Sequence, residues 1–444
     1  MANAINLIVL LADRIWIGVL GTTYLAAVGM AHAALVICIT TIMAPGIGTL
    51  TGVAKTTGAN DHEGLSNYVR NGFLIGIATG LLFGVGGWFL PDMVMSIMSQ
   101  DAETSQAVMA AAHSYLQISL FGLCVQAPLY VLTFALQGAG RAKAAFKLQA
   151  VAPIVNLILD PILIFGVHEL IPSWLPTFGL GLDGAALASV CGYSIALLLA
   201  LFYVPSVLNV RFGISKLKAV SFKIWRIILG IGLPGTVEQL VRSAAILLLV
   251  KILSPFGSAV LAAYTASIMV IMFLIFPGLA LGQATAALVG QNLGAGKARR
   301  AYGTALKSIG MYFAFMLAAS LIIYWAAEGL IAIFDRNPDV IREGSTILRR
   351  YCYCFPLIAF AIIVSKVFAG SGKTLPPMLT SMISHLAIQI PLAWWWSQQS
   401  GPSGAYWAMV VAFWMHGLLN SLVFFRWKRA FVDNAEQTGR STSN

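Results

Sequence analysis

The sequence predicts an all-α membrane protein, with twelve transmembrane helices forming two six-helix bundles related by pseudo-twofold symmetry along the membrane normal. Three observations predict it. The 444 residues are 59% hydrophobic and only 10% charged, whereas soluble domains carry about 25% charged residues. Apolar runs of roughly 18 residues or more, enough to cross the hydrocarbon as a helix, recur along the chain. The second half also repeats the first. Because such runs are too long for barrel strands, the backbone must satisfy its hydrogen bonds as helices.

Each expected span is one of these apolar runs. The first lacks a basic leading segment, so we do not expect a cleaved signal peptide. Residues 1–208 are expected to form an N-lobe, 209–221 a cytoplasmic connection, 222–428 a C-lobe and 429–444 a polar, disordered tail. The spans cover residues 4–20, 25–55, 66–90, 104–138, 142–167, 184–208, 222–254, 259–292, 302–334, 340–370, 374–398 and 404–428.

The charge of +11 is distributed unevenly between the two sides of the expected bundle. Most of the 27 Lys and Arg residues fall in alternate connections and the tail, while the opposite loops hold Arg336, Arg342, Arg349 and Arg350. This is the positive-inside pattern, which places both termini in the cytoplasm and argues against nucleic-acid binding. The 5 Cys residues lie in apolar spans, so we interpret them as small buried hydrophobes rather than disulfide or metal ligands.

An internal repeat divides the chain into two similar halves. "GTTYLAA" (21–27) aligns with "GSAVLAA" (257–263), and "APGIGTLTGVAKTTGA" (44–59) aligns at the same offset with "ALGQATAALVGQNLGA" (280–295). Further on, "GLDGAALASV" (181–190) aligns with "GPSGAYWAMV" (401–410). An even number of spans per repeat gives both halves the same orientation, with a cavity expected between them, which suits a secondary transporter. A purely structural repeat is the alternative.

Several motifs together resemble one family. They are "ADRIWIGVLGTTYLAAVGMA", "LQGAGRAKAAFKLQAVAPIVNLILDPILIFG", "GLPGTVEQL" and "VGQNLGAGKARRA". In this order they resemble the MATE (multidrug and toxic compound extrusion) family over most of the chain. The resemblance implies two six-helix lobes and export of amphipathic, often cationic compounds in exchange for H⁺ or Na⁺, without ATP. It further implies a prokaryotic inner-membrane protein, a monomer with no cofactor, whose partners are membrane lipid and a small amphipathic substrate.

Only three acids lie at membrane depth: Asp13, Asp160 and Glu238. An ionised group there costs about 2.5–3.5 kcal/mol on insertion scales, so such groups normally face a cavity or a partner. Asn156 and Asp160 share one helix face because they are four residues apart. With Asp13 in the same lobe, these side chains suit a small hard cation, and the close carboxylates could equally hold a proton. Arg14 is the alternative, purely structural partner of Asp13.

The repeat provides an internal control for this cluster. Asp13 aligns with Leu249, and aligning Pro161 with Pro391 places Leu386 and Ile390 opposite Asn156 and Asp160. The second half therefore keeps the scaffold without the cluster, which favours a functional role in the first. The family resemblance implies the same cation-coupling site, completed in some members by fourth-span polar groups. Those positions hold Tyr115 and Thr133 here.

The second lobe has its own polar candidates, which could contact substrate. Glu238 and Arg242 are four apart, in the orientation that favours an intrahelical ion pair. The acid that one branch of the family has in its tenth span is replaced by Ile358, and the nearest charge is Lys366. A Na⁺ site is therefore not expected in this lobe. His385 and His416 could titrate near neutral pH, but packing roles are favoured.

Three alternative functions were compared with antiport. A flippase for a lipid or lipid-linked sugar, or an exporter of an anionic substrate, would use the bases of the second lobe. An intramembrane enzyme is disfavoured because the sequence has no H-E-x-x-H motif, no paired D-D-x-x-D and no nucleophile elbow. A channel is disfavoured by the duplicated bundle and the lack of a pore-lining repeat. No Pro precedes Asp13, so the bend that the family's first span usually permits is not expected.

Overall fold

The computed structural model describes residue 13 and residues 15–89, 91–92, 106–166, 179–210 and 220–428. This part of the chain contains helices and turns and no strand, as expected for a backbone that must pair its own polar groups in lipid. Nine of its helices are long and apolar enough to cross a membrane, or ten if one bent pair is counted as a single span. Residues 1–12, 14 and 429–444, including Arg14 and the expected tail, lie outside the described residues.

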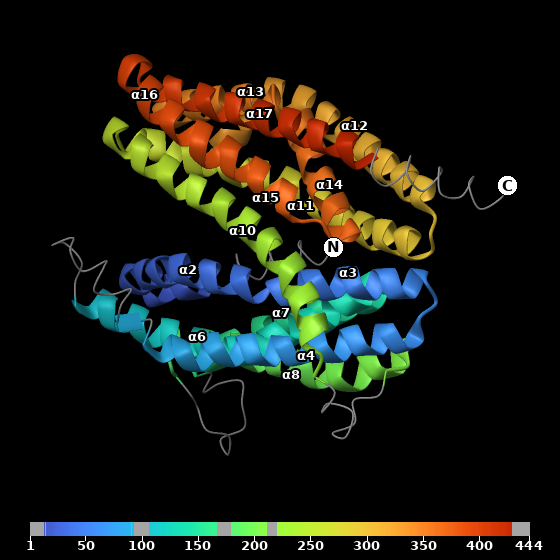
Figure 1. Ribbon diagram of the computed structural model, residues 1–444. Coiled ribbons are helices and arrows are strands. Elements are labelled where there is room, and N and C mark those ends of the chain that lie inside the picture. Colours follow the sequence, from blue (N-terminus) through green and yellow to red (C-terminus); the bar gives the residue numbers. More distant parts are fainter. Residues whose placement is uncertain are drawn as a thin grey trace. The chain divides into compact units, whose positions relative to one another are not determined.

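Packing divides the chain into two compact units, each with its own hydrophobic core (Figure 1). The first comprises residues 1–53 and 61–233, and the second residues 54–60 and 234–444. The division thus falls inside the seventh span rather than before it. One reason lies in Asn71, whose side-chain oxygen accepts hydrogen bonds from Ser221 N at 2.9 Å and Trp225 Nε1 at 3.1 Å. These bonds tie the beginning of this span to the first unit.

The helices of the first unit match the expected spans to within a few residues. Residue 13 and residues 15–20 are helical, and the second span is interrupted at Met43. Its described helices are α2 (Thr22–Ile42), α3 (Ala44–Gly58), α4 (His62–Val85), the 3₁₀ turn η1 (Gly86–Phe89), α6 (Gln106–Gly138), α7 (Ala142–Phe165) and α8 (Leu182–Leu208). The end of α3 belongs to the second unit.

Small residues allow α7 and α8 to pack closely. Buried small residues recur every fourth position along α8: Gly184, Ala188, Gly192, Ala196 and Ala200. A Cβ on Gly192 would lie 2.6 Å from the Ala152 carbonyl oxygen, and one on Gly184 would contact the Leu163 carbonyl oxygen. Stripes of small residues bring transmembrane helices into backbone contact. Here they bring the polar face of α7 against α8.

The second unit is built from the same sequence of spans. Its helices are α10 (Phe222–Leu253, with its first turns in the first unit), η2 (Ser254–Phe256), α11 (Ser258–Gly294), α12 (Ala298–Ala332), α13 (Pro338–Cys352), α14 (Phe355–Ser371), α15 (Leu375–Ser381), the π-helix η3 (Met382–Gln389), α16 (Ile390–Ser400) and α17 (Pro402–Lys428). The tenth span is bent by 59° between α13 and α14. In the eleventh span, α15, η3 and α16 follow one another without a break.

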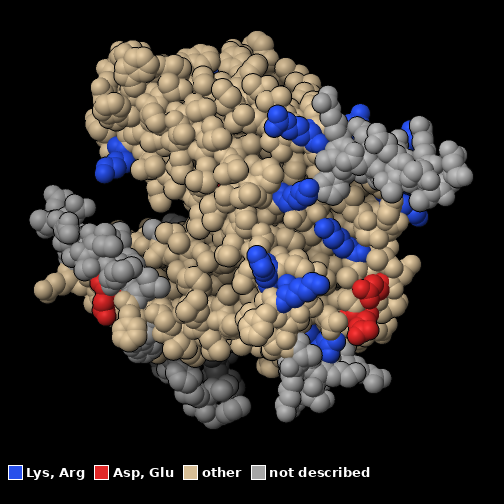
Figure 2. All heavy atoms as spheres, in the orientation of Figure 1, with Lys and Arg blue, Asp and Glu red and all other residues tan. Residues whose placement is uncertain are grey.

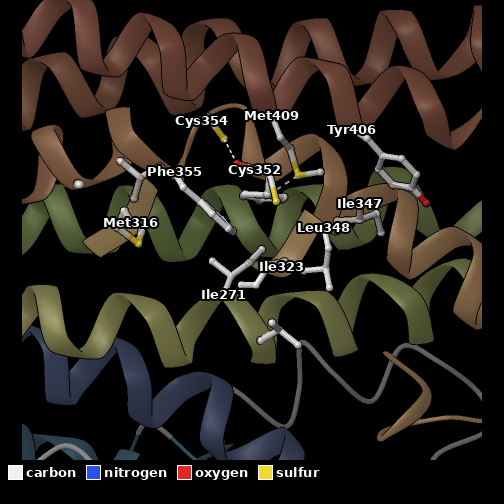
Figure 3. Close-up of a cluster of buried hydrophobic side chains, with 14 of the residues drawn as sticks. Ile271, Met316, Ile323, Ile347, Leu348, Cys352, Cys354, Phe355, Tyr406 and Met409 are labelled. Atoms are coloured by element: carbon white, nitrogen blue, oxygen red, sulfur yellow. Dashed lines mark hydrogen bonds between the residues drawn. The ribbon is translucent and has the colours of Figure 1, made fainter. Parts of the chain in front are cut away.

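The core of the second unit combines aliphatic, aromatic and sulfur-containing side chains (Figure 3). Cys352 and Cys354 lie inside it, where Cys354 Sγ donates to the Tyr351 carbonyl oxygen at 3.1 Å. All 5 Cys residues are free thiols. Cys38, Cys352 and Cys354 are buried as the sequence predicted, whereas Cys124 and Cys191 are partly exposed.

The exterior of the helices is apolar. Large hydrophobic side chains such as Trp325 and Phe202 are about four-fifths exposed, at 83% and 79%. On the face shown in Figure 2, most surface side chains are uncharged. Lys and Arg are few there, and Asp and Glu are fewer still. Lipid is the environment that such a surface requires, since soluble proteins rarely expose large contiguous apolar areas.

Candidate functional site

The predicted polar residues of α7 lie together in the interior of the first unit. Asp160 is fully buried and Asn156 is 4% exposed. They belong to a stripe of buried residues that recurs at every fourth position along α7 (Ala152, Asn156, Asp160 and Ile164) and faces α8. Asn156 Nδ2 donates to Asp160 Oδ1 at 3.1 Å and to the Ser189 hydroxyl oxygen on α8, also at 3.1 Å. The amide is therefore fixed by two partners.

Asp13 completes the cluster from the first span. Its side chain is hydrogen-bonded to that of Asp160. A hydrogen bond between two carboxyl groups requires a proton on one of them. This contact therefore needs one proton shared between two acids that lie inside an apolar lobe.

Three oxygen atoms of this cluster are buried and have no hydrogen-bond partner among the described residues: Asp13 Oδ1, Asn156 Oδ1 and Asp160 Oδ2. Buried acceptors are normally paired, so these three mark a place where a cation or donor could be bound. All are acceptors, and a small hard cation takes such oxygen ligands. The arrangement suits either a shared proton or a small cation in its place.

A second group of polar side chains lies near the acids, and none of its members was predicted from the sequence. Gln126 Nε2 on α6 donates to the Tyr130 hydroxyl oxygen at 2.9 Å. Tyr193 on α8 is hydrogen-bonded to both of them and lies within electrostatic reach of Asp13. Neutral polar residues in a membrane span cannot be recognised as a group from the sequence. They are recognised only when the fold shows that their side chains lie together. Tyr193 and Ser189, four apart on α8, could have been found as one face of that helix.

The two fourth-span candidates take different positions. Thr133 is fully buried, and its hydroxyl donates to the Tyr130 carbonyl oxygen of its own helix at 2.9 Å. Tyr115 packs against the hydrophobic cluster that contains Leu116, Leu120 and Ile17. Two further polar groups of this span, Gln126 and Tyr130, are linked to Asp13 through Tyr193.

The expected ion pair of the second unit forms. Arg242 Nη1 donates to Glu238 Oε1 at 2.7 Å, and the Ser365 hydroxyl lies 2.9 and 2.8 Å from the two carboxylate oxygens. Lys366 packs against α11 at Gly282 and lies within electrostatic reach of both charged groups. The buried acid Glu238 therefore has two bases near it, Arg242 and Lys366.

His385 and Gln389 form a buried polar pair in the eleventh span. Aligning the two prolines placed Leu386 and Ile390 opposite Asn156 and Asp160. The buried residues that recur every fourth position are Ala152, Asn156, Asp160 and Ile164 in α7, and Ser381, His385, Gln389 and Ala393 in the eleventh span. The second of these stripes runs through the π-helix η3, which lies just before Pro391.

The second unit therefore also has a buried polar pair, in the span that repeats α7. His385 Nδ1 lies 2.7 Å from Gln389 Oε1, again across four residues. The ring of His385 also contacts that of His416 on α17, with centroids 5.0 Å apart. The pair is made of an imidazole and an amide, so the acid chemistry of the first unit is not repeated.

Comparison with known proteins supports the same organisation. The MatE family model matches the chain twice, over residues 1–162 and 234–395, once in each half. A probable multidrug resistance protein, YpnP of Bacillus subtilis, is 23% identical over 91% of this chain and 87% of its own. An FAD transporter of Shewanella oneidensis is 23% identical over 90% and 86%.

A solved structure provides the corresponding comparison of folds. A MOP superfamily transporter from Pyrococcus furiosus superimposes with a TM-score of 0.86 at 22% identity, covering 98% of this chain and 94% of that one. At this identity the likeness establishes the fold: an all-α membrane protein of two helical lobes. The double family match over most of the sequence establishes the ancestry, and the chain belongs to the MatE family of multidrug and toxic compound extrusion transporters.

Proposed function

We propose that this chain is a cation-coupled antiporter that exports amphipathic, cationic compounds by alternating access. It would act as a monomer without a cofactor in the inner membrane, with both termini in the cytoplasm. Its family and its structural neighbours are transporters, and relatives are described as multidrug resistance or export proteins. The observation that carries the coupling proposal is the buried pair of carboxyl groups, Asp13 and Asp160, with Asn156 beside them.

The acid pair can exchange one cation for another. Two adjacent carboxylates in a dry interior repel each other, so the fully ionised empty site is unfavourable. A proton removes one charge, and Na⁺ balances one charge while contacting the oxygen atoms of Asp13, Asn156 and Asp160 that have no other partner. Both H⁺ and Na⁺ therefore remain candidates for the coupling ion.

Coupling requires that the ion bind the two orientations of the transporter differently. A ligand shifts a conformational equilibrium only by its differential affinity for the two states. We propose that occupation of the pair favours the outward-open state and substrate release, and that ion release to the cytoplasm resets the protein.

Proteoliposome efflux of a cationic dye, driven separately by imposed Na⁺ and H⁺ gradients, tests this proposal. Asp160→Asn should abolish gradient-driven efflux while the protein stays folded, because the pair loses one titratable group. Asp183→Asn is the matched control. Asp183 lies in the same unit and accepts from the Ser114 hydroxyl at 2.8 Å, a bond that an amide oxygen also accepts. Gradient-driven efflux by Asp160→Asn at the unmodified rate would refute the proposal.

A second candidate function is export of an anionic compound, a lipid-linked one included. The observation that favours it is the second unit's excess of base, with Arg242 and Lys366 against Glu238. A relative described as an FAD transporter adds to it. Under this reading an anionic dye replaces the cationic one in the efflux assay, and Asp160→Asn again abolishes the coupled rate.

A further inference from the structure

The second unit encloses a cavity of roughly 230 Å³ within its own helices. Its walls come from α10, α11, α13, α14, η3 and α17, and most of them are aliphatic or aromatic. Ile271, which is labelled in the core of Figure 3, is one of the wall residues. Leu249, the residue that aligns with Asp13, is another. The cavity therefore occupies the part of the second unit that corresponds to the acid pair of the first.

Three buried polar atoms of the cavity walls have no hydrogen-bond partner among the described residues. They are the Tyr264 hydroxyl oxygen, His385 Nε2 and His416 Nε2. Their residues are 2%, 2% and 4% exposed, so solvent does not satisfy them from outside. A buried polar group without a partner is destabilising, and three in one cavity indicate a bound molecule that pairs with them.

The π-helix η3 contributes two of the polar walls. It lies just before Pro391, which has no N–H to donate to the carbonyl of Ala387. His385 and Gln389 both belong to η3, are buried and line the cavity. π segments in α-helices occur frequently at functional sites.

The charges at the cavity favour an anion. Arg242 lines it, and its side chain remains 31% exposed although one of its nitrogens is paired with Glu238. No Asp or Glu is among the residues that line the cavity in the described part of the chain. Lys366 is a further base close to the cavity and lies within electrostatic reach of Glu238 and Arg242.

We propose that this cavity is a binding site for a small aromatic monocarboxylate. The aromatic ring would lie against the aliphatic walls, and the carboxylate would accept hydrogen bonds from Arg242, Tyr264 and His416. The size fits: an apolar cavity of about 150 Å³ holds benzene, which leaves room here for a carboxylate as well. The site deepens the second candidate function, on which it rests for its role in transport, by naming a class of anionic ligand.

Equilibrium binding of radiolabelled benzoate to the purified protein tests the site, with benzyl alcohol and benzylammonium as competitors. The three molecules share one ring and differ in the charge of the head group. Benzoate should bind saturably, and both competitors should bind at least about tenfold more weakly. Displacement by benzylammonium at the same concentration as unlabelled benzoate would overturn the proposal, and so would the absence of saturable benzoate binding.

Two variants locate the binding. Tyr264→Phe removes one hydroxyl and should weaken benzoate binding about tenfold. Tyr312→Phe is the matched control, because the Tyr312 hydroxyl donates to the Leu274 carbonyl oxygen at 3.0 Å and is not among the cavity walls. Ala361→Leu adds a branched side chain to the wall and should block binding. Unchanged benzoate affinity in both Tyr264→Phe and Ala361→Leu would place the ligand elsewhere and refute the site.

Asp160→Asn separates this site from the coupling proposal. It should lose gradient-driven efflux and bind benzoate as the unmodified protein does, because Asp160 lies in the first unit. If the unmodified protein exports dye under an ion gradient but does not bind benzoate, only the cavity proposal fails. If the unmodified protein binds benzoate but the Asp160→Asn variant still transports dye at the full gradient-driven rate, only the coupling proposal fails.

Discussion

Ser189 provides the sharpest test of how the acid pair is organised, because it contacts the pair only through Asn156. The Asn156 side-chain nitrogen donates to Ser189 and Asp160 at equal distances of 3.1 Å, which leaves its oxygen as an unpaired acceptor beside the acids. In Ser189→Ala one N–H of the amide keeps its bond to Asp160, and the other N–H loses its acceptor. The amide loses one of its two anchors and the oxygen is held less firmly in place.

The magnitude follows from the single hydrogen bond that is lost. Leaving a buried donor without its partner costs about 1–3 kcal/mol. If this amount is lost only in the ion-bound state, the apparent affinity for the driving ion falls about 5- to 160-fold. The maximal rate should change little, since both carboxyl groups remain. Dye efflux measured against the concentration of the driving ion separates the two parameters.

Ser194→Ala is the matched control for this prediction. Ser194 is on the same helix, and its hydroxyl donates to the Val190 carbonyl oxygen of that helix at 2.7 Å. It should leave the apparent ion affinity unchanged. If Ser189→Ala is folded and has the affinity of the unmodified protein, Asn156 does not take part in ion binding as described. If its maximal rate falls with its affinity unchanged, Ser189 acts on the transport cycle by another route.

Two further predictions concern the stability of the purified protein, measured by thermal or denaturant unfolding in detergent. Gly192→Ala should destabilise by about 1–3 kcal/mol, since its Cβ would lie 2.6 Å from a carbonyl oxygen of α7. Gly230→Ala, where a Cβ meets nothing within 4 Å, should be neutral or stabilise by up to about 1 kcal/mol, and equal effects would contradict the close packing. Glu238→Gln should cost about 3–5 kcal/mol because it leaves buried bases uncompensated. Glu328→Gln, at an ion pair whose acid is 63% exposed, should change stability by less than about 1 kcal/mol, and a comparable loss there would refute the reasoning.

The helices were predictable because lipid leaves the backbone few choices. An apolar run of this length must pair its own N–H and C=O groups, so hydropathy alone located α6, α7, α8 and α17 to within a few residues. The acids were predictable for a related reason. Asp13 and Asp160 are costly at membrane depth, which makes each conspicuous without knowledge of its neighbours. Their meeting followed from both lying in one repeat.

The neutral members of the sites were not predictable in the same way. Ser189, Gln126 and Tyr193 cost little in a span and resemble many other residues there. Their role depends on which faces of α6 and α8 turn inward, and packing of small residues such as Gly192 decides that. His385 was recognised as a residue but not as a partner of Gln389. The two side chains meet within a π-helix, which hydropathy does not report.

The His385–Gln389 pair adds a second buried polar pair to the comparison of the two repeats. Both units have a polar pair four residues apart on the buried stripe of the same span, so this position can hold polar groups in either lobe. What differs is the charge. In the first unit the pair contains an acid that meets a second acid, and its charge changes when a cation binds or leaves. In the second unit Leu249 replaces that second acid, the pair is His385 and Gln389, and the nearby Arg242 is permanently charged. Ion exchange needs the first kind of site, whereas recognition of an organic anion needs the second. Duplication followed by loss of acids in one copy would therefore separate energy coupling from ligand recognition without altering the helical scaffold that both units share.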